Sequence, residues 1–202
     1  MKHSSTRAVF EYWNKRRGMR SAPERNEIDP ADIRVALGDT FMLAADFVDQ
    51  QRFRLAGTRV CALFCREVKG EEFTALWSES SRKPVAELLT IVNEESVGVV
   101  AGVTARTEEG HDAELEMLLL PLAHSGHARI RALGVLVPTV PPYWLGTRPV
   151  STLDIVTLRH IEPESKTRNA PQFGRLAPGS RLRHGFVVYS GGREAPSGDA
   201  TG

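Results

Sequence analysis

The sequence has few cysteines, no long apolar run and no excess of charge of one sign. It holds 26 Lys and Arg against 25 Asp and Glu over 202 residues, so charge gives no reason to expect a nucleic acid partner. The longest apolar run, residues 117–122, contains a proline and is too short to span a bilayer. The first residues are polar and lack the apolar core of a signal peptide. We therefore expect a cytoplasmic protein with no membrane segment.

Cys61 and Cys65 are the two cysteines of the chain. They stand four residues apart on a predicted helix, where the backbone does not favour a disulfide. Two cysteines without a secretion signal indicate a reducing compartment. Two interpretations stay open: Cys61 is a small core residue with Cys65 more exposed, or the pair is redox active, since Arg66 is adjacent and reactivity needs an electropositive, accessible setting.

The composition, with 41% hydrophobic and 25% charged residues, is typical of a protein with one globular core. Val9, Tyr12 and Trp13 are spaced as on one face of a first helix, which ends in basic residues before Gly18. Cations are common at helix ends, so these residues are interpreted as a solvated end, with phosphate binding as the alternative.

A second helix is predicted from Asp29 to Gly38, because Asp is a good cap and Pro30 suits the first helical position. Alternating apolar residues in 41–47 and 51–55 then predict a hairpin. The segment 57–70 follows as a short amphipathic helix that ends at a glycine.

Residues 81–95 have the apolar spacing of a longer core-facing helix, with Pro84 in its first turn. Three strands, 97–107, 112–122 and 128–137, are joined by short turns and predict an antiparallel meander. Residues 153–158 are interpreted as one more strand or an extended cover.

The chain therefore divides into an N-terminal helical extension (1–38), a central domain (39–160) and an irregular tail (161–202). Residues 161–183 contain proline and arginine without periodicity. Within the tail, the apolar residues 186–189 are the one segment that could dock as an added strand.

Several spaced motifs resemble those of the PAS domain family. The short helix resembles the PAS signature through Phe64, Val68-Lys69-Gly70, Phe73 and Leu76-Trp77. Other motifs resemble a bacterial, largely alphaproteobacterial, PAS-like subfamily of small stand-alone proteins: Tyr12-Trp13, Arg16-Arg17-Gly18, Pro23, Arg25, Ile28-Asp29-Pro30, Ile33, residues 53–59 and residues 116–122. The resemblance covers roughly residues 8 to 160 and rests on several motifs rather than one.

The resemblance implies an α+β fold: a PAS-like five-stranded antiparallel sheet with helices on one face, extra N-terminal helices and an irregular C-terminal tail. It also implies a sensory or regulatory module that binds a small ligand or a protein partner. The alternative is a structural homodimer with a filled core and no ligand. An enzyme is not expected, because we find no nucleophile–base pair, metal set or phosphate loop.

The resemblance leaves the cofactor unknown. Flavin photochemistry in PAS domains needs a cysteine soon after the glycine that ends the short helix, and Gly70 is followed by none. Haem-binding PAS domains usually offer a histidine on the long helix, and residues 81–95 hold none. His124 and His127 lie in one turn without a third ligand nearby, which argues against a metal site.

Arg54 and Arg59 are the predicted polar contacts. A buried arginine must be paired, either by a carboxylate such as Glu116 or Glu114 or by an anionic ligand. An internal bridge is the favoured interpretation, because buried charges are normally paired within the protein.

The remaining candidates are apolar. Residues that would line a ligand pocket, or else an ordinary filled core, are Cys61, Phe64, Trp77, Leu88, Val92, Val103 and Leu119. Residues expected to form a homodimer interface on the first helix are Val9, Tyr12 and Trp13.

Overall fold

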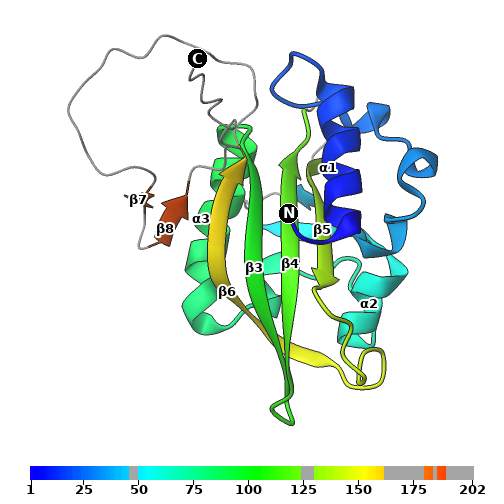
Figure 1. Ribbon diagram of the computed structural model, residues 1–202, viewed down its shortest axis with the longest axis vertical. Coiled ribbons are helices and arrows are strands. Elements are labelled where there is room, and N and C mark those ends of the chain that lie inside the picture. The colour runs from blue at the N-terminus through cyan, green and yellow to red at the C-terminus, as the bar shows by residue number, and fades with distance from the viewer. Residues whose placement is uncertain (46–49, 124–129, 162–179, 184–185, 190–202) are drawn as a thin grey trace, which may run out of the picture.

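The computed structural model describes residues 1–45, 50–123, 130–161, 180–183 and 186–189. Its centre is one sheet in the order β2-β1-β5-β4-β3-β6-β8-β7 (Figure 1). The strands are β1 (Thr40–Ala45), β2 (Gln51–Ala56), β3 (Gly98–Thr107), β4 (Asp112–Pro121), β5 (Ile130–Pro138), β6 (Val150–Ile161), β7 (Ser180–Arg183) and β8 (Phe186–Tyr189). The helices are α1 (Ser4–Arg17), α2 (Thr58–Phe64) and α3 (Glu79–Glu94), with four 3₁₀ turns, η1 (Arg25–Glu27), η2 (Pro30–Ile33), η3 (Leu37–Asp39) and η4 (Phe73–Leu76).

The α+β, PAS-like fold class is confirmed, although the antiparallel part of the sheet has six strands instead of five. The sixth is β6, which pairs with β3 over the whole length of that strand. The shorter range 153–158 missed its ends, because polar residues alternate irregularly along β6. β8 pairs with β6 in parallel at Leu158 and Val188.

The sheet carries helices on both faces (Figure 1). One face is covered by α2, η4 and α3, and there the main core forms around residues such as Phe41, Leu88 and Leu119. On the other face α1 packs its apolar side on β4 and β5, burying Val9 and Trp13. The sequence therefore folds the N-terminal extension onto the face that the other two helices leave open.

Two local predictions in the helices are wrong. Residues 29–38 form two 3₁₀ turns rather than one α-helix, although Asp29 caps the first as expected, accepting the Ala31 N–H at 2.9 Å. The run is too short for a helix to gain much from propagation. The cap of α1 is His3, whose Nδ1 accepts the Ser5 N–H at 3.1 Å. α3 begins at Glu79, so Pro84 lies inside it, beyond the first turn.

A β-bulge in the first hairpin also changes which residues face the core. Met42 pairs with Leu55 and Leu43 pairs with Phe53, which leaves Arg54 as the extra residue of β2. Phe53 is buried, whereas Leu55 is 40% exposed. The bulge breaks the simple alternation that the sequence pattern assumed.

Candidate functional site

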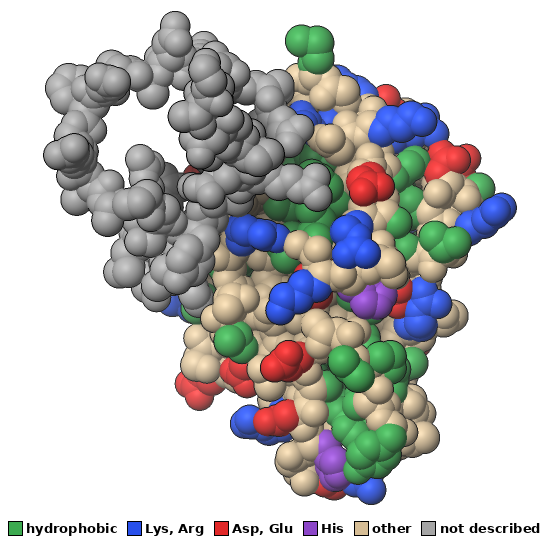
Figure 2. Space-filling model, in the orientation of Figure 1, with side chains coloured by type: hydrophobic (Ala, Val, Ile, Leu, Met, Phe, Trp, Pro, Cys, Tyr) green, Lys and Arg blue, Asp and Glu red, His purple; other side chains and the backbone are tan. Residues whose placement is uncertain are grey.

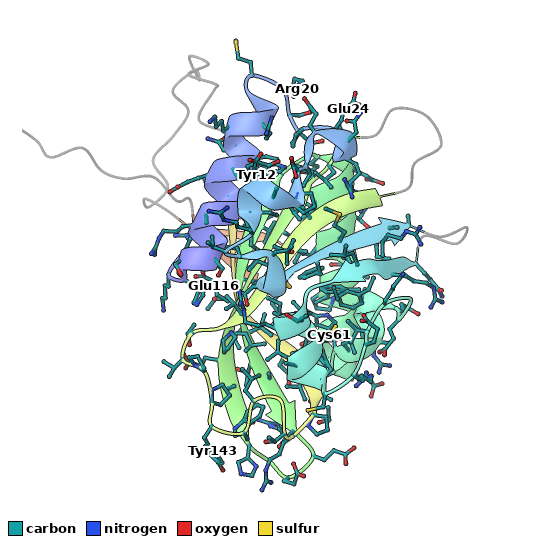
Figure 3. The ribbon with its side chains drawn as sticks, turned by 90° about the vertical axis from the view of Figure 1, so that its right-hand side faces the viewer. Tyr12, Arg20, Glu24, Cys61, Glu116 and Tyr143 are labelled. Atoms are coloured by element: carbon teal, nitrogen blue, oxygen red, sulfur yellow. The ribbon has the colours of Figure 1, made fainter. Side chains whose placement is uncertain are left out.

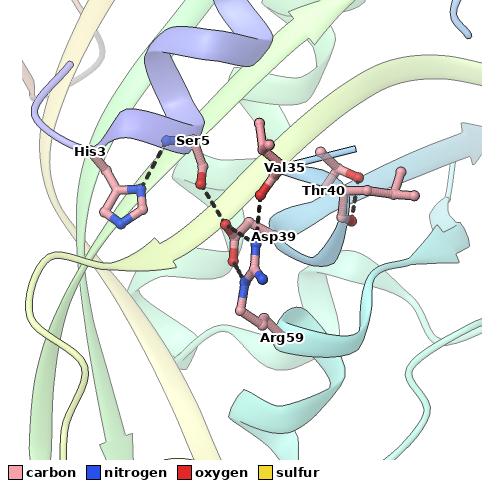
Figure 4. A network of polar contacts seen from close by, with 7 residues as sticks. His3, Ser5, Val35, Asp39, Thr40 and Arg59 are labelled. Carbon is pink, nitrogen blue, oxygen red and sulfur yellow. Dashed lines mark hydrogen bonds and ion pairs between the residues drawn. The ribbon is translucent and has the colours of Figure 1, made fainter. Parts of the chain in front are cut away.

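A buried carboxylate joins the start of α1 to the start of α2 (Figure 4). Asp39, in η3, is only 2% exposed. Its Oδ2 accepts a hydrogen bond from the Ser5 hydroxyl at 2.6 Å and another from Arg59 Nη2 at 2.8 Å. Arg59 also donates to the carbonyl of Val35 at 3.2 Å. Because three segments far apart in the sequence meet here, this network fixes the N-terminal extension to the central domain.

Arg59 is one of the two predicted polar contacts, and it forms an internal ion pair as favoured. Its partner is Asp39 instead of Glu114 or Glu116. The hydrogen bond with Asp39 raises the pKa of the Arg59 guanidinium, and partial burial opposes this effect only in part. About half of the Arg59 side chain, 54%, stays exposed. No sequence pattern pointed to Asp39, since a single acidic residue before a strand is common on protein surfaces.

Glu116 lies on β4, beside the start of the chain (Figure 3). Its two carboxylate oxygens accept backbone N–H groups of Lys2 at 2.6 Å and of His3 at 3.0 Å. Burial alone would raise the pKa of Glu116, but these hydrogen bonds outweigh it and the pKa lies below its ordinary value. Glu116 therefore stays ionised near neutral pH and anchors the chain before α1.

The predicted pairing of Arg54 with Glu116 or Glu114 is wrong. Arg54 is the bulged residue of β2, an edge strand, and its side chain is exposed. Glu116 lies on β4, with β1 and β5 between the two strands, and its oxygens bond the amides described above. Arg54 alternates with Phe53, and the structure leaves it on the exposed side of β2, where it needs no internal carboxylate.

The predicted pocket residues on the helix side of the sheet are packed together in the main core. Those with at most 2% exposure are Phe64, Trp77, Leu88, Val92, Val103 and Leu119. Beside them four aromatic rings form a continuous cluster: Phe41, Phe53, Phe73 and Trp77, with neighbouring ring centroids 5.4 to 5.7 Å apart. The rings occupy space between the sheet and η4, next to α2 and α3.

The two cysteines differ in environment. Cys61 is half-buried against the core, with its Sγ 3.5 Å from a Glu67 carboxylate oxygen (Figure 3). Burial raises the pKa of the Cys61 thiol, and the nearby carboxylate adds to the effect. Cys65 is exposed and caps α2 with a left-handed backbone, at φ 51°. These surroundings favour a thiol at Cys61 and do not support the redox interpretation for it.

Val9 and Trp13 do not offer the exposed interface that the sequence predicted. Val9 is fully buried, and Trp13 is 3% exposed with its Nε1 donating to the Pro121 carbonyl at 2.8 Å. Tyr12 is half-buried, and its hydroxyl donates to Glu27 O at 3.1 Å and accepts the Asp29 N–H at 2.7 Å. All three side chains attach α1 to its own chain, because the outer sheet face supplies an apolar partner for the helix.

A groove of about 550 Å³ lies on the α1 side of the sheet, over β3, β4 and β6. Among the predicted site residues, Val103 and Glu116 border it, although the Val103 side chain belongs to the core on the opposite face. Other lining residues are Lys2, Gly102, Glu114, Thr157 and Arg159. Sequence analysis missed this groove, because its walls come from segments more than 100 residues apart.

The described part of the chain has neither a metal-binding cluster nor a membrane-spanning helix. It holds no group of three or more His, Cys, Asp or Glu residues that could bind a metal ion. The His124 and His127 pair lies outside the described residues. None of the described helices is long and apolar enough to cross a membrane.

Comparison with protein families identifies the family of this chain. Residues 1–137 match the family model described as the PAS domain. Solved structures also match, among them the PAS domain of a protein from Colwellia psychrerythraea, at 14% identity and a TM-score of 0.39 over 55% of this chain and 97% of that one. A search of curated proteins finds no match. Because the family model covers well over half of its length, the chain belongs to the PAS domain family.

Proposed function

We propose that this PAS domain is a regulatory interaction module that recognises a protein partner and works with a filled core. The observation that carries the proposal is the ring cluster of Phe41, Phe53, Phe73 and Trp77 between the sheet and its helices. Because aromatic side chains fill this space, it serves core packing rather than ligand binding. The small-ligand sensor that the sequence suggested is therefore the second candidate.

The partner surface is assigned to the loop between β5 and β6. Val140 is 75% exposed and Tyr143 is 83% exposed. Tyr143 lies at the end of the molecule away from Glu24, which precedes η1 (Figure 3). The loop is held by Trp144, which is 3% exposed and whose carbonyl accepts the N–H groups of Thr147 and Arg148. An exposed tyrosine beside apolar residues is typical of a binding hot spot.

The homodimer expected from the sequence remains within this proposal, with the loop as its contact in place of α1. A second copy and a different signalling protein would both use an exposed apolar surface. PAS domains are in general sensory or interaction modules, which supports a role without catalysis. A cytoplasmic location also stays a prediction.

Native mass spectrometry of the protein purified from its own host tests the filled core. We expect the mass of the bare chain, before and after mild unfolding. A small molecule that is released only on unfolding, and whose retention is lost in Trp77→Phe, would overturn the proposal in favour of a core-ligand sensor.

Photo-crosslinking tests the loop. A benzophenone amino acid replaces Tyr143 in cells of the host, and the control replaces Met19, which is 96% exposed and near η1. We expect a discrete crosslinked product from position 143 alone, which mass spectrometry identifies as a second copy or another protein. Equal products from both positions, or none from 143, would contradict the proposed surface.

A further inference from the structure

The groove on the α1 side of the sheet exists because β3 and β6 have small side chains at its centre. Gly102 on β3 pairs with Thr157 on β6, and its N–H donates to the Thr157 hydroxyl at 3.1 Å. A Cβ atom at position 102 would lie 2.6 Å from that hydroxyl oxygen. The surface of the sheet between the start of the chain and β6 is therefore recessed. Its apolar residues include Val100 and Val156.

Basic side chains gather at the N-terminal end of this groove. Lys2 and Arg159 both line it, and Arg7 Nη1 donates to the Lys2 carbonyl at 2.6 Å. Within the described part of the chain, none of these three cations forms an ion pair with a carboxylate. Figure 2 views this side of the molecule, and several basic side chains surround the place where Figure 1 marks the N-terminus.

Two carboxylates also border the groove, and neither neutralises this end. Both oxygens of Glu116 already accept backbone N–H groups, and the residue is only 6% exposed. Glu114 pairs with Thr104, whereas Arg159 pairs with Val100. These two positions of β3 are four residues apart, which corresponds to about 13 Å along a strand. At this end of the groove, Lys2 and Arg159 face only the occupied carboxylate of Glu116, which leaves a local positive excess.

We propose that this groove binds a small organic anion that has one anionic head and an apolar body. Lys2 and Arg159 hold the head, because paired cations form strong charge-assisted hydrogen bonds with oxyanions. The body lies against Val100 and Val156, and the volume of about 550 Å³ is typical of small-molecule sites. This site is separate from the aromatic core and from the loop around Tyr143.

Binding would act on the start of the chain. Lys2 belongs to the segment that Glu116 holds through backbone hydrogen bonds, whereas Arg159 belongs to β6. An anion that contacts both binds only while this segment is docked, and so it stabilises the docked state. Through this groove, a ligand could therefore change the docking of the N-terminal segment without a cavity in the core.

Amide chemical shifts of the full chain test the proposal, with naphthalene-1-sulfonate as the anionic probe and 1-naphthalenemethanol as its neutral counterpart. We expect saturable shifts at Gly102, Thr104 and Thr157 with the sulfonate, and binding of the neutral compound at least about tenfold weaker. Loss of one charge-assisted contact in Arg159→Gln should weaken the sulfonate by about tenfold. Lys83→Gln, on the exposed side of α3, is the matched control and should change nothing.

Lys2→Gln is the second variant, because Lys2 is exposed outside the sheet and its replacement does not disturb strand pairing. It should also weaken the sulfonate several-fold, and added salt should weaken wild-type binding further. The proposal is overturned if both probes bind equally, if neither Arg159→Gln nor Lys2→Gln changes the affinity, or if the shifts lie around Trp77. None of these outcomes depends on crosslinking at Tyr143, so the two proposals fail separately.

Discussion

On the α3 side of the sheet, Ala101, Val103 and Ala105 of β3 are at most 2% exposed under the helices. On the α1 side, the residues between them, Gly102 and Thr104, remain partly exposed. The same strand therefore has one face that is closed by packing and one that is only half covered. The comparison teaches that stability is concentrated on the first face, while accessible polar chemistry lies on the second.

Phe73→Ala should break the closed face most strongly. Phe73 is fully buried and contacts three other rings of the aromatic cluster. Removal of a buried phenylalanine costs roughly 3–5 kcal/mol in free energy of unfolding. Urea denaturation measures the change, and Tyr143→Ala, at an exposed position, should stay within about 0.5 kcal/mol of wild type. Similar losses in both variants would show that the core assignment is wrong.

Arg59→Gln should have the next largest effect, because it leaves Asp39 buried with an unpaired charge. We expect a loss of about 2–3 kcal/mol, whereas Asp39→Asn should cost less, since Arg59 is half exposed and can be solvated. Combining both changes should cost less than the sum of the two. A double-mutant cycle by urea denaturation checks this order, and strictly additive losses would contradict it.

Glu116 should make stability depend on acid pH. Its pKa is lower in the folded protein than in the unfolded chain, so its contribution is fully present above the ordinary glutamate pKa. The contribution is lost as the pH falls through the lower, folded pKa. We expect Glu116→Gln to cost about 1 kcal/mol at pH 7 and less at pH 3.

The control for this pH prediction is Glu114→Gln, at an exposed position on the same strand. It should leave the urea midpoint nearly unchanged at both pH values, because Glu114 holds no part of α1. A Glu116→Gln loss that is equal at pH 7 and pH 3 would argue against the anchoring role of the carboxylate.

The smallest predicted effect concerns the thiols at the edge of the closed face. Cys61 is half-buried with a raised pKa, while Cys65 is exposed. Alkylation by iodoacetamide at pH 8 should therefore be slower at Cys61, on the order of fivefold. Peptide mass spectrometry follows each site separately, with Cys65→Ser used to isolate Cys61. Faster alkylation of Cys61 than of Cys65 would instead support the redox interpretation.

Much of the fold was predictable because local patterns and burial agree. Apolar spacing in α3 and the turns of the β3–β4–β5 meander led to the right elements within a few residues. The predictions failed where one extra residue shifted the strand register, and where a short segment formed 3₁₀ turns instead of an α-helix. The bulge at Arg54 and the 3₁₀ turns after Asp29 are such places.

The candidate site was predictable only in part. Arg59 was identified as a polar contact, because an inward arginine must be paired. Its partner, Asp39, and the amides that bind Glu116 lie 20 and more than 110 residues away, respectively. Such contacts depend on how segments meet in space, which no local pattern reports.

The sequence by itself determined most helices and strands of the domain, since periodicity and turn residues act over neighbouring positions, and its spaced motifs carried the resemblance to the PAS family. Only the tertiary structure decided which side of the sheet α1 covers, and hence that Trp13 is buried and the groove stays open. Gly134 illustrates the physical reason. It pairs with Phe41, and any Cβ atom there would overlap the Phe41 ring. Close packing between distant segments sets such requirements, and they exist only once the chain has folded.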